Sequence, residues 1–85
     1  MNLKFTKEAW EDYLFWQKNN KTTLKRINEL IRDTIRSPFD GLGKPEPLRF
    51  ELAGFWSRRI DIEHRLIYRI NHNTLEIISC RFHYN

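Results

Sequence analysis

The spacing of apolar residues changes once along this 85-residue chain, and that change limits the folds it can adopt. Before Pro38, apolar residues recur every three or four positions, which is typical of amphipathic helices. After Pro47 they alternate with polar residues, which is typical of strands with one buried face. Helices followed by strands indicate an α+β fold in which the helices pack on a sheet.

Two helices are expected before Pro38. Thr6 is a suitable N-cap for the first, and Glu8 then lies in its first turn, where the helix dipole favours a negative charge. This helix should end near Lys18. Its apolar face should contain Trp10, Tyr13, Leu14 and Gln17, with Ala9 and Trp16 at the margins. The second helix has a more regular apolar face, which consists of Leu24, Ile27, Leu30, Ile31, Thr34 and Ile35. It should end at Ser37, because the residue before a proline avoids helical dihedral angles.

One short strand is expected before the first helix, and the other strands follow a loop over residues 38–47 that holds all 3 prolines. The expected strands cover residues 3–5, 48–52, 56–62, 65–70 and 74–82. The sequence therefore predicts two N-terminal helices packed on one face of a twisted antiparallel sheet of four to five strands. We expect a single domain over residues 1–85.

Register decides which side chains share the face of the sheet that the helices leave open. If Ile60 and Ile62 face the helices, the apolar residues of segment 65–70 must do so too, and Arg59 and Arg65 then lie together on the open face. The last strand has two competing apolar sets. They are Leu75 with Ile77, and Ile78 with Cys80 and Phe82. Arg81 and His83 reach the open face only if the second set is buried, and a bulge near Ile77 and Ile78 would bury both sets.

The overall charge and the single cysteine suggest where such a chain works. The net charge of +4 permits a polyanionic partner without requiring one. Cys80 cannot form an internal disulfide, which fits a reducing cytoplasm. The N-terminus has no signal-peptide pattern, and no segment approaches the ~20 apolar residues of a membrane span. We expect a soluble cytoplasmic protein without membrane contact. One cysteine and 3 separated histidines give no zinc spacing, so no metal or other cofactor is expected.

Three kinds of side chain suggest metal-free cleavage of RNA. Such cleavage needs a base for the 2′-hydroxyl, an acid for the leaving 5′-oxygen and cations for the phosphorane. Glu46, between Pro45 and Pro47, suits the base; His83 suits the acid; Arg65 offers a planar fork for phosphate. The alternative is a solvated glutamate, solubilising arginines and an incidental terminal histidine. Residue types and spacing leave both interpretations open.

Several segments together resemble one known family. They are residues 8–13 (EAWEDY), 27–31 (INELI), 43–48 (GKPEPL), 54–60 (GFWSRRI), 63–66 (EHRL) and 80–84 (CRFHY). They closely resemble the YoeB branch of the RelE/ParE toxin superfamily, over essentially the whole chain. That family packs N-terminal helices on a twisted antiparallel sheet, in agreement with the periodicity.

The resemblance implies a role for each candidate site residue. Glu46 would be the general base, His83 the general acid and Arg65 the clamp on the transition state. Tyr84 would complete the catalytic set by positioning the nucleotide. The expected RNA-binding residues are Lys44, Arg49, Arg58, Arg59 and Arg81. Three positions depart from the family pattern: Arg49 stands where lysine can occur, Phe82 stands where tyrosine can occur, and Asn85 follows the His-Tyr pair at which the family typically ends.

The resemblance also implies a function and partners. YoeB-like proteins are toxins of type II toxin–antitoxin pairs that cleave messenger RNA in the A site of the 70S ribosome and so inhibit translation. The expected enzyme is thus a metal-independent endoribonuclease. A YefM-like antitoxin, whose extended C-terminal segment wraps the toxin, is the expected partner, and a homodimer is permitted. The alternative is a ParE-like toxin that poisons a topoisomerase without nuclease chemistry, and a third is a module that only binds nucleic acid or antitoxin.

Overall fold

The computed structural model describes residues 1–82, and its helices precede most of its strands, as the change of periodicity predicts. Its elements are β1 (Asn2–Phe5), α1 (Lys7–Asn19), α2 (Lys21–Arg36), β2 (Glu46–Pro47), the short 3-10 helix η1 (Phe50–Leu52), β3 (Trp56–Arg59), β4 (Arg65–Asn71) and β5 (Thr74–Ser79). Within residues 1–82, neither α-helix combines the length and the apolar character needed to cross a lipid bilayer.

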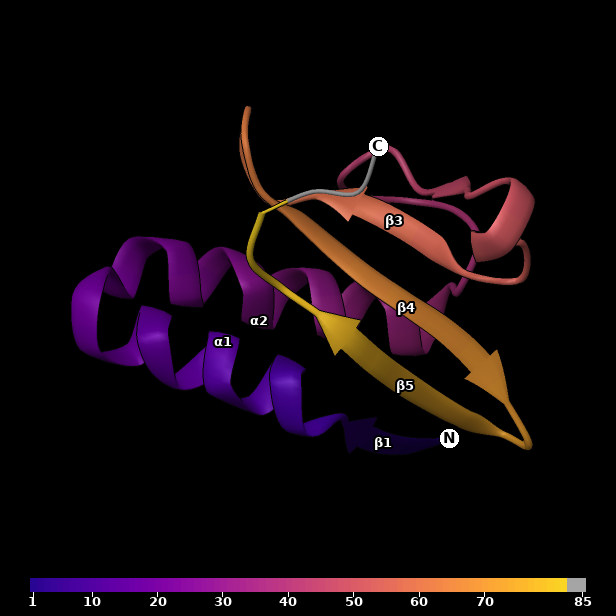
Figure 1. The fold of residues 1–85 in the computed structure, drawn as a ribbon, viewed down its shortest axis with the longest axis horizontal. Coiled ribbons are helices and arrows are strands. Elements are labelled where there is room, and N and C mark those ends of the chain that lie inside the picture. The colour runs from indigo at the N-terminus through magenta and orange to yellow at the C-terminus, as the bar shows by residue number, and fades with distance from the viewer. Residues whose placement is uncertain (83–85) are drawn as a thin grey trace.

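The strands form one sheet in the order β1-β5-β4-β3-β2, and both helices lie on the same side of it (Figure 1). Strands β2 to β5 pair as antiparallel neighbours, whereas β1 pairs with β5 in parallel. The predicted α+β architecture is confirmed, but the expectation of a purely antiparallel sheet is wrong for β1. The physical reason is that β1 joins the rest of the sheet only through the two helices, so no hairpin forces it to run antiparallel to its neighbour.

The hydrophobic core lies between the helices and the sheet. The helices contribute Ala9, Trp16, Ile27, Leu30 and Ile31, and the strands and their ends contribute Ile60, Leu66, Tyr68, Leu75, Ile77 and Cys80. Trp16 donates a hydrogen bond from Nε1 to the carbonyl of Cys80 at 2.8 Å, which satisfies its buried N–H. The buried residues of α1 are Ala9 and Trp16. Trp10, by contrast, is 47% exposed, so the predicted apolar face of this helix is rotated from the real one.

A bulge in β5 resolves the two apolar sets of the last strand. Tyr68 lies opposite Ile77, but the preceding Ile67 lies opposite Ser79, so Ile78 is the extra residue. Ile77 and Cys80 are both fully buried in the core. The bulge that the sequence suggested near Ile77 and Ile78 is therefore confirmed. It does not bury both sets, because Ile78 is only half-buried and Phe82 is 53% exposed.

Two expected strand segments do not form as predicted. Residues 48–52 contain the 3-10 helix η1 instead of a strand, and Phe50 is 85% exposed with a φ of 58°. Strand β3 ends at Arg59, and Ile62 is 98% exposed instead of facing the helices. Asp61 accounts for the early end, because its Oδ1 accepts the N–H groups of Glu63 and His64 at 2.8 and 2.6 Å and closes a turn there.

Candidate active site

The open face of the sheet, away from the helices, collects several of the residues predicted from the sequence. Glu46 of β2 pairs with Ser57 of β3, and Arg59 of β3 pairs with Arg65 of β4. Residues directly opposite each other on adjacent strands share a face, and so do residues two apart on one strand. Glu46, Arg59 and Arg65 therefore lie on one face, opposite to that of the intervening Arg58.

Glu46 is exposed at an edge of the sheet, on a backbone that is anchored on both sides. Before it, the carbonyl of Gly43 accepts a hydrogen bond from the N–H of Arg59 at 2.6 Å. After it, the N–H of Leu48 donates to the carbonyl of Phe55 at 2.9 Å. The flanking prolines also fix their own φ angles. The Glu46 carboxylate is thus accessible to a ligand, and the backbone that carries it is held in place.

Arg65 is held over the turn that precedes β4. Its Nη1 donates to the carbonyls of Asp61 and His64 at 2.8 and 3.1 Å, and its side chain is half-buried. Because a guanidinium has five N–H donors, these two bonds leave others available for a phosphate.

The positive charge of the open face is not uniform. Arg69 is paired with Glu76 at 2.7 Å, and this guanidinium lowers the pKa of the Glu76 carboxyl below its usual value. Arg59 and Arg65, by contrast, have no salt-bridge partner among residues 1–82, and they share this face with the exposed carboxylate of Glu46, where phosphoryl chemistry would need them.

The described chain ends next to Arg65. The N–H of Arg65 donates to the carbonyl of Phe82 at 2.8 Å, and the N–H of Phe82 donates to Nδ1 of His64 at 2.7 Å. His64 was not predicted as a site residue; the only sequence signal is its position directly before Arg65. The predicted acid His83 and the predicted positioning residue Tyr84 lie outside the described residues, so their roles stay predictions.

The other predicted RNA-binding cations differ in their surroundings. Lys44, Arg49 and Arg59 are exposed. Arg81 is half-buried, and its guanidinium lies 3.5 Å from the centre of the Phe15 ring of α1. Lys44, Arg49 and Arg59 are therefore available to a polyanion, whereas Arg81 already makes a cation–π contact with a helix.

Arg58 contradicts its predicted role. Its side chain is fully buried and forms a salt bridge with Asp33 at 2.7 Å. An arginine without exposed surface cannot contact RNA in this conformation, and burial on the helix side of β3 is the physical reason that the prediction is wrong. The alternation of β3 did place Arg58 inward, between Trp56 and Ile60.

Asp33 is a buried charged residue that the sequence did not reveal. It is 4% exposed, and its carboxyl pKa falls from 3.8 to about 2 because the N–H of Leu42 and the guanidinium of Arg58 both bind the carboxylate. In the sequence it resembles an ordinary polar position of a helix. Its one sequence signal is its place next to Thr34 and three residues after Leu30, two positions of the predicted apolar face of this helix.

Cys80 takes no part in the chemistry of this face. It is fully buried, and burial raises the pKa of its thiol to about 12. A thiol that stays protonated near neutral pH is not a nucleophile. Its burial agrees with its place in the second apolar set of the last strand.

Two N-terminal helices on one side of a five-stranded mixed sheet are the arrangement found in toxins of the YoeB/RelE type. Residues 5–84 match the family described as "YoeB-like toxin of bacterial type II toxin-antitoxin system", and the chain belongs to that family. It is 56% identical to the toxin YoeB of Escherichia coli K12 over 84 residues, which are 99% of this chain and 100% of the relative.

Solved structures agree with this assignment. The chain is similar to a YoeB/ParE toxin from Agrobacterium tumefaciens, with a TM-score of 0.97 and 52% identity, over 99% of this chain and 100% of that one. It is also similar to the toxin in a YoeB–YefM complex from Staphylococcus aureus, with a TM-score of 0.91 and 46% identity, over 99% and 98% of the two chains. The S. aureus toxin has also been solved as a dimer.

Proposed function

We propose that this toxin is a metal-independent endoribonuclease that cleaves messenger RNA in the ribosomal A site. The observation that carries the proposal is the joint position of Glu46, Arg59 and Arg65 on the open face, in a chain of the YoeB-like family. An exposed carboxylate beside two guanidinium groups without salt bridges to described residues supplies a base and a phosphate-binding surface.

In the proposed reaction, Glu46 removes the proton from a ribose 2′-hydroxyl, and the resulting oxygen attacks the adjacent phosphorus. Arg65 and Arg59 bind the phosphate oxygens, where negative charge develops in the transition state. His83 donates a proton to the departing 5′-oxygen, which leaves as a 5′-hydroxyl. The other product carries a 2′,3′-cyclic phosphate, or a 3′-phosphate after hydrolysis. Phe82, the residue before His83, is hydrogen-bonded to His64 and to Arg65. These bonds hold Phe82 next to the phosphate-binding Arg65 and so support the role of His83 as the acid.

The test is single-turnover cleavage of a messenger threaded on 70S ribosomes with an occupied P site. Glu46→Gln and His83→Gln should each lower the rate by about 10²- to 10⁴-fold, as expected for loss of a general base or acid. Glu51→Gln, which neutralises another exposed carboxylate on the nearby 3-10 helix η1, is the matched control and should cleave at the wild-type rate. Wild-type rates from both site variants contradict the mechanism. Folded protein that makes no cut but blocks supercoiling by a topoisomerase supports the ParE-like alternative.

We also propose a YefM-like antitoxin as the partner, as in the S. aureus complex, and self-association into a homodimer. An apolar groove of about 540 Å³ between β1, α1 and α2 supports contact with another chain. It is lined by Leu3, Phe5, Trp10, Tyr13, Asn28, Ile31, Arg32 and Ile35. Co-expression with a YefM-like protein should restore growth of cells that produce the toxin, and failure of every such protein tested contradicts the pairing. Sedimentation of the purified toxin tests the dimer.

A further inference from the structure

We propose that Arg58 is a positioning residue, whose buried guanidinium holds the loop over residues 37–43 and thereby sets the place of Glu46. This inference rests on the proposed function, because Glu46 matters as the base of that reaction. Arg58 touches neither the open face nor a ligand bound there, since its side chain is fully buried on the helix side of β3.

All five N–H donors of the Arg58 guanidinium have acceptors. Nε donates to the hydroxyl of Tyr68 at 3.2 Å. Nη1 donates to Oδ2 of Asp33 at 2.7 Å and to the carbonyl of Leu42 at 3.1 Å. Nη2 donates to the carbonyls of Ser37 and Asp40 at 2.6 and 2.8 Å. A buried guanidinium is tolerated only when its charge and donors are satisfied in this way.

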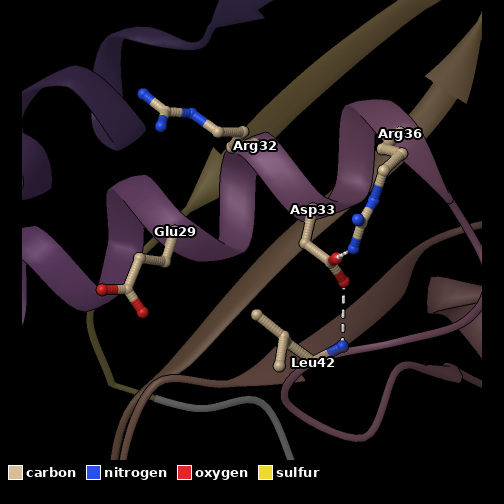
Figure 2. A pocket seen from close by; sticks show the side chains of 5 residues that line it. All are labelled: Glu29, Arg32, Asp33, Arg36 and Leu42. Atoms are coloured by element: carbon tan, nitrogen blue, oxygen red, sulfur yellow. Dashed lines mark hydrogen bonds and ion pairs between the residues drawn. The ribbon is translucent and has the colours of Figure 1, made fainter.

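The loop is closed around Arg58 by its partners as well. The hydroxyl of Tyr68 donates to the carbonyl of Pro38 at 2.7 Å. Oδ2 of Asp33 accepts the N–H of Leu42 at 2.8 Å, and Oδ1 accepts from Arg36. Figure 2 shows Asp33 extending from α2 toward Leu42 on the loop, with Arg36 beside it, at the edge of a hollow of about 330 Å³. Each end of the loop is thus tied to one buried ion pair.

Gly41 shows how closely the loop approaches this ion pair. Its φ is +110°, and a Cβ at this position would lie 2.2 Å from Oδ2 of Asp33. Only glycine lets the backbone pass at this distance without displacing the carboxylate. The loop path, Asp33 and Arg58 are therefore mutually dependent.

A short, constrained connection leads from this loop to Glu46. The last loop residue, Gly43, accepts the N–H of Arg59 at 2.6 Å, and Glu46 then pairs with Ser57. Ser57 and Arg59 are the two neighbours of Arg58 in β3. Strand β3 thus binds the loop through Arg58, which faces the helices. Through Ser57 and Arg59, which face the other way, it aligns the segment that carries the Glu46 carboxylate. A base that must meet the 2′-hydroxyl within hydrogen-bond distance depends on such alignment.

Two variants test the inference. Arg58→Lys keeps the positive charge beside Asp33, but an ammonium has three donors for the five acceptors. Some of the loop carbonyls therefore lose their hydrogen bond to this side chain. Tyr68→Phe keeps the ring in the core and removes only the hydroxyl between Arg58 and Pro38. Ile27→Val, a change in the core of α2 away from the loop, is the control for general destabilisation.

The readouts are amide hydrogen exchange and cleavage on the ribosome. The amides of Leu42 and Arg59 should exchange faster in Arg58→Lys and Tyr68→Phe but not in Ile27→Val, with the amide of Thr6 as a remote reference. Arg58→Lys should lower the single-turnover rate by about 10- to 100-fold, as expected for a misplaced catalytic group. The ribosome concentration that gives half of the maximal rate should not change. In the double variant with Glu46→Gln, Arg58→Lys should cause little further loss, because both act through the same carboxylate.

Unchanged exchange at Leu42 and Arg59 in folded Arg58→Lys overturns the inference, and so does a loss that adds in full to that of Glu46→Gln. If Arg58→Lys does not fold, Tyr68→Phe decides by the same two readouts. A wild-type protein that cuts no messenger overturns the proposed function instead, and the exchange rates then decide whether Arg58 holds the loop.

Discussion

At the scale of single residues, Asp33 links the ion pair to the pH dependence of stability. Its pKa in the folded chain is about 2, mainly because the N–H of Leu42 and the guanidinium of Arg58 stabilise the carboxylate, against an ordinary value of 3.8. A lowered pKa contributes stability that is complete above the unfolded pKa and is lost as the pH falls through the folded one. We therefore expect about 2 kcal/mol of unfolding free energy to disappear between about pH 4 and pH 2.

The measurement is the ¹³C chemical shift of the Asp33 carboxyl during acid titration, together with urea unfolding across the same range. A carboxyl midpoint near 4 contradicts the prediction. The exposed carboxyl of Glu51 is the internal control for the effect of acid on the rest of the molecule.

Arg58 shows what local pattern can and cannot predict about a residue. In the alternation of the strand it falls in the same set as Ile60, and like Ile60 its side chain is buried. Its function was nevertheless predicted from its residue type, because a cation next to Arg59 suggests RNA binding. What makes its burial possible is Asp33, 25 positions earlier on another element. No short window of sequence contains both partners, so the ion pair required the three-dimensional arrangement. Arg59 and Arg65 were predictable as neighbours because their shared face follows from alternation and register. Glu46 was expected in a loop, and its pairing with Ser57 of β3 appears only in the structure.

At the scale of elements, Thr6 joins the start of α1 to the bulge of β5. Its Oγ1 accepts the N–H of Ala9 at 3.1 Å and donates to the carbonyl of Ile78 at 2.9 Å. Thr6→Ala removes both bonds and should lower the unfolding free energy by about 1–3 kcal/mol, since a cap contributes about 0.5–2 and a further hydrogen bond about 1. Urea unfolding measures this loss. Thr6→Ser keeps the hydroxyl and is the matched control; equal losses from the two variants contradict the prediction.

The elements also differ in how far their sequences determine them. The N-cap at Thr6 and the second helix follow from short-range signals, and both are confirmed. Residues 48–52 alternate like a strand, but β2 has only 2 residues and Leu48 bonds to Phe55 across a tight loop. Without a partner strand of matching length, alternation is not enough, and the chain turns at Phe50 instead. The face of α1 was misjudged because Trp10 and Trp16 are equally apolar in sequence and only packing distinguishes them.

At the scale of the whole molecule, the sheet separates stability from the proposed chemistry. Its helix side carries the core and the buried Arg58, and its open side carries Glu46, Arg59 and Arg65. This division explains why substitutions on the open side should change activity with little effect on folding. It also explains why β3 contributes to stability through Arg58 and to the proposed chemistry through the next residue, Arg59.

The net charge is +4, and the exposed cations that contribute to it lead to a prediction about how the whole molecule docks on the ribosome. Each phosphate that a cation neutralises contributes a slope of about −0.7 to −0.9 to the dependence of log affinity on log salt concentration. Arg59→Gln and Arg49→Gln should each reduce the slope by about that amount, because Arg59 is exposed on the open face and Arg49 is exposed three residues after Glu46. Lys25→Gln changes the net charge equally but lies on the exposed side of α2. It should leave the slope unchanged in binding titrations with 70S ribosomes at several salt concentrations. If Lys25→Gln reduces the slope as much as the arginine variants do, attraction depends on net charge and not on the open face; affinity that does not vary with salt excludes electrostatic docking altogether.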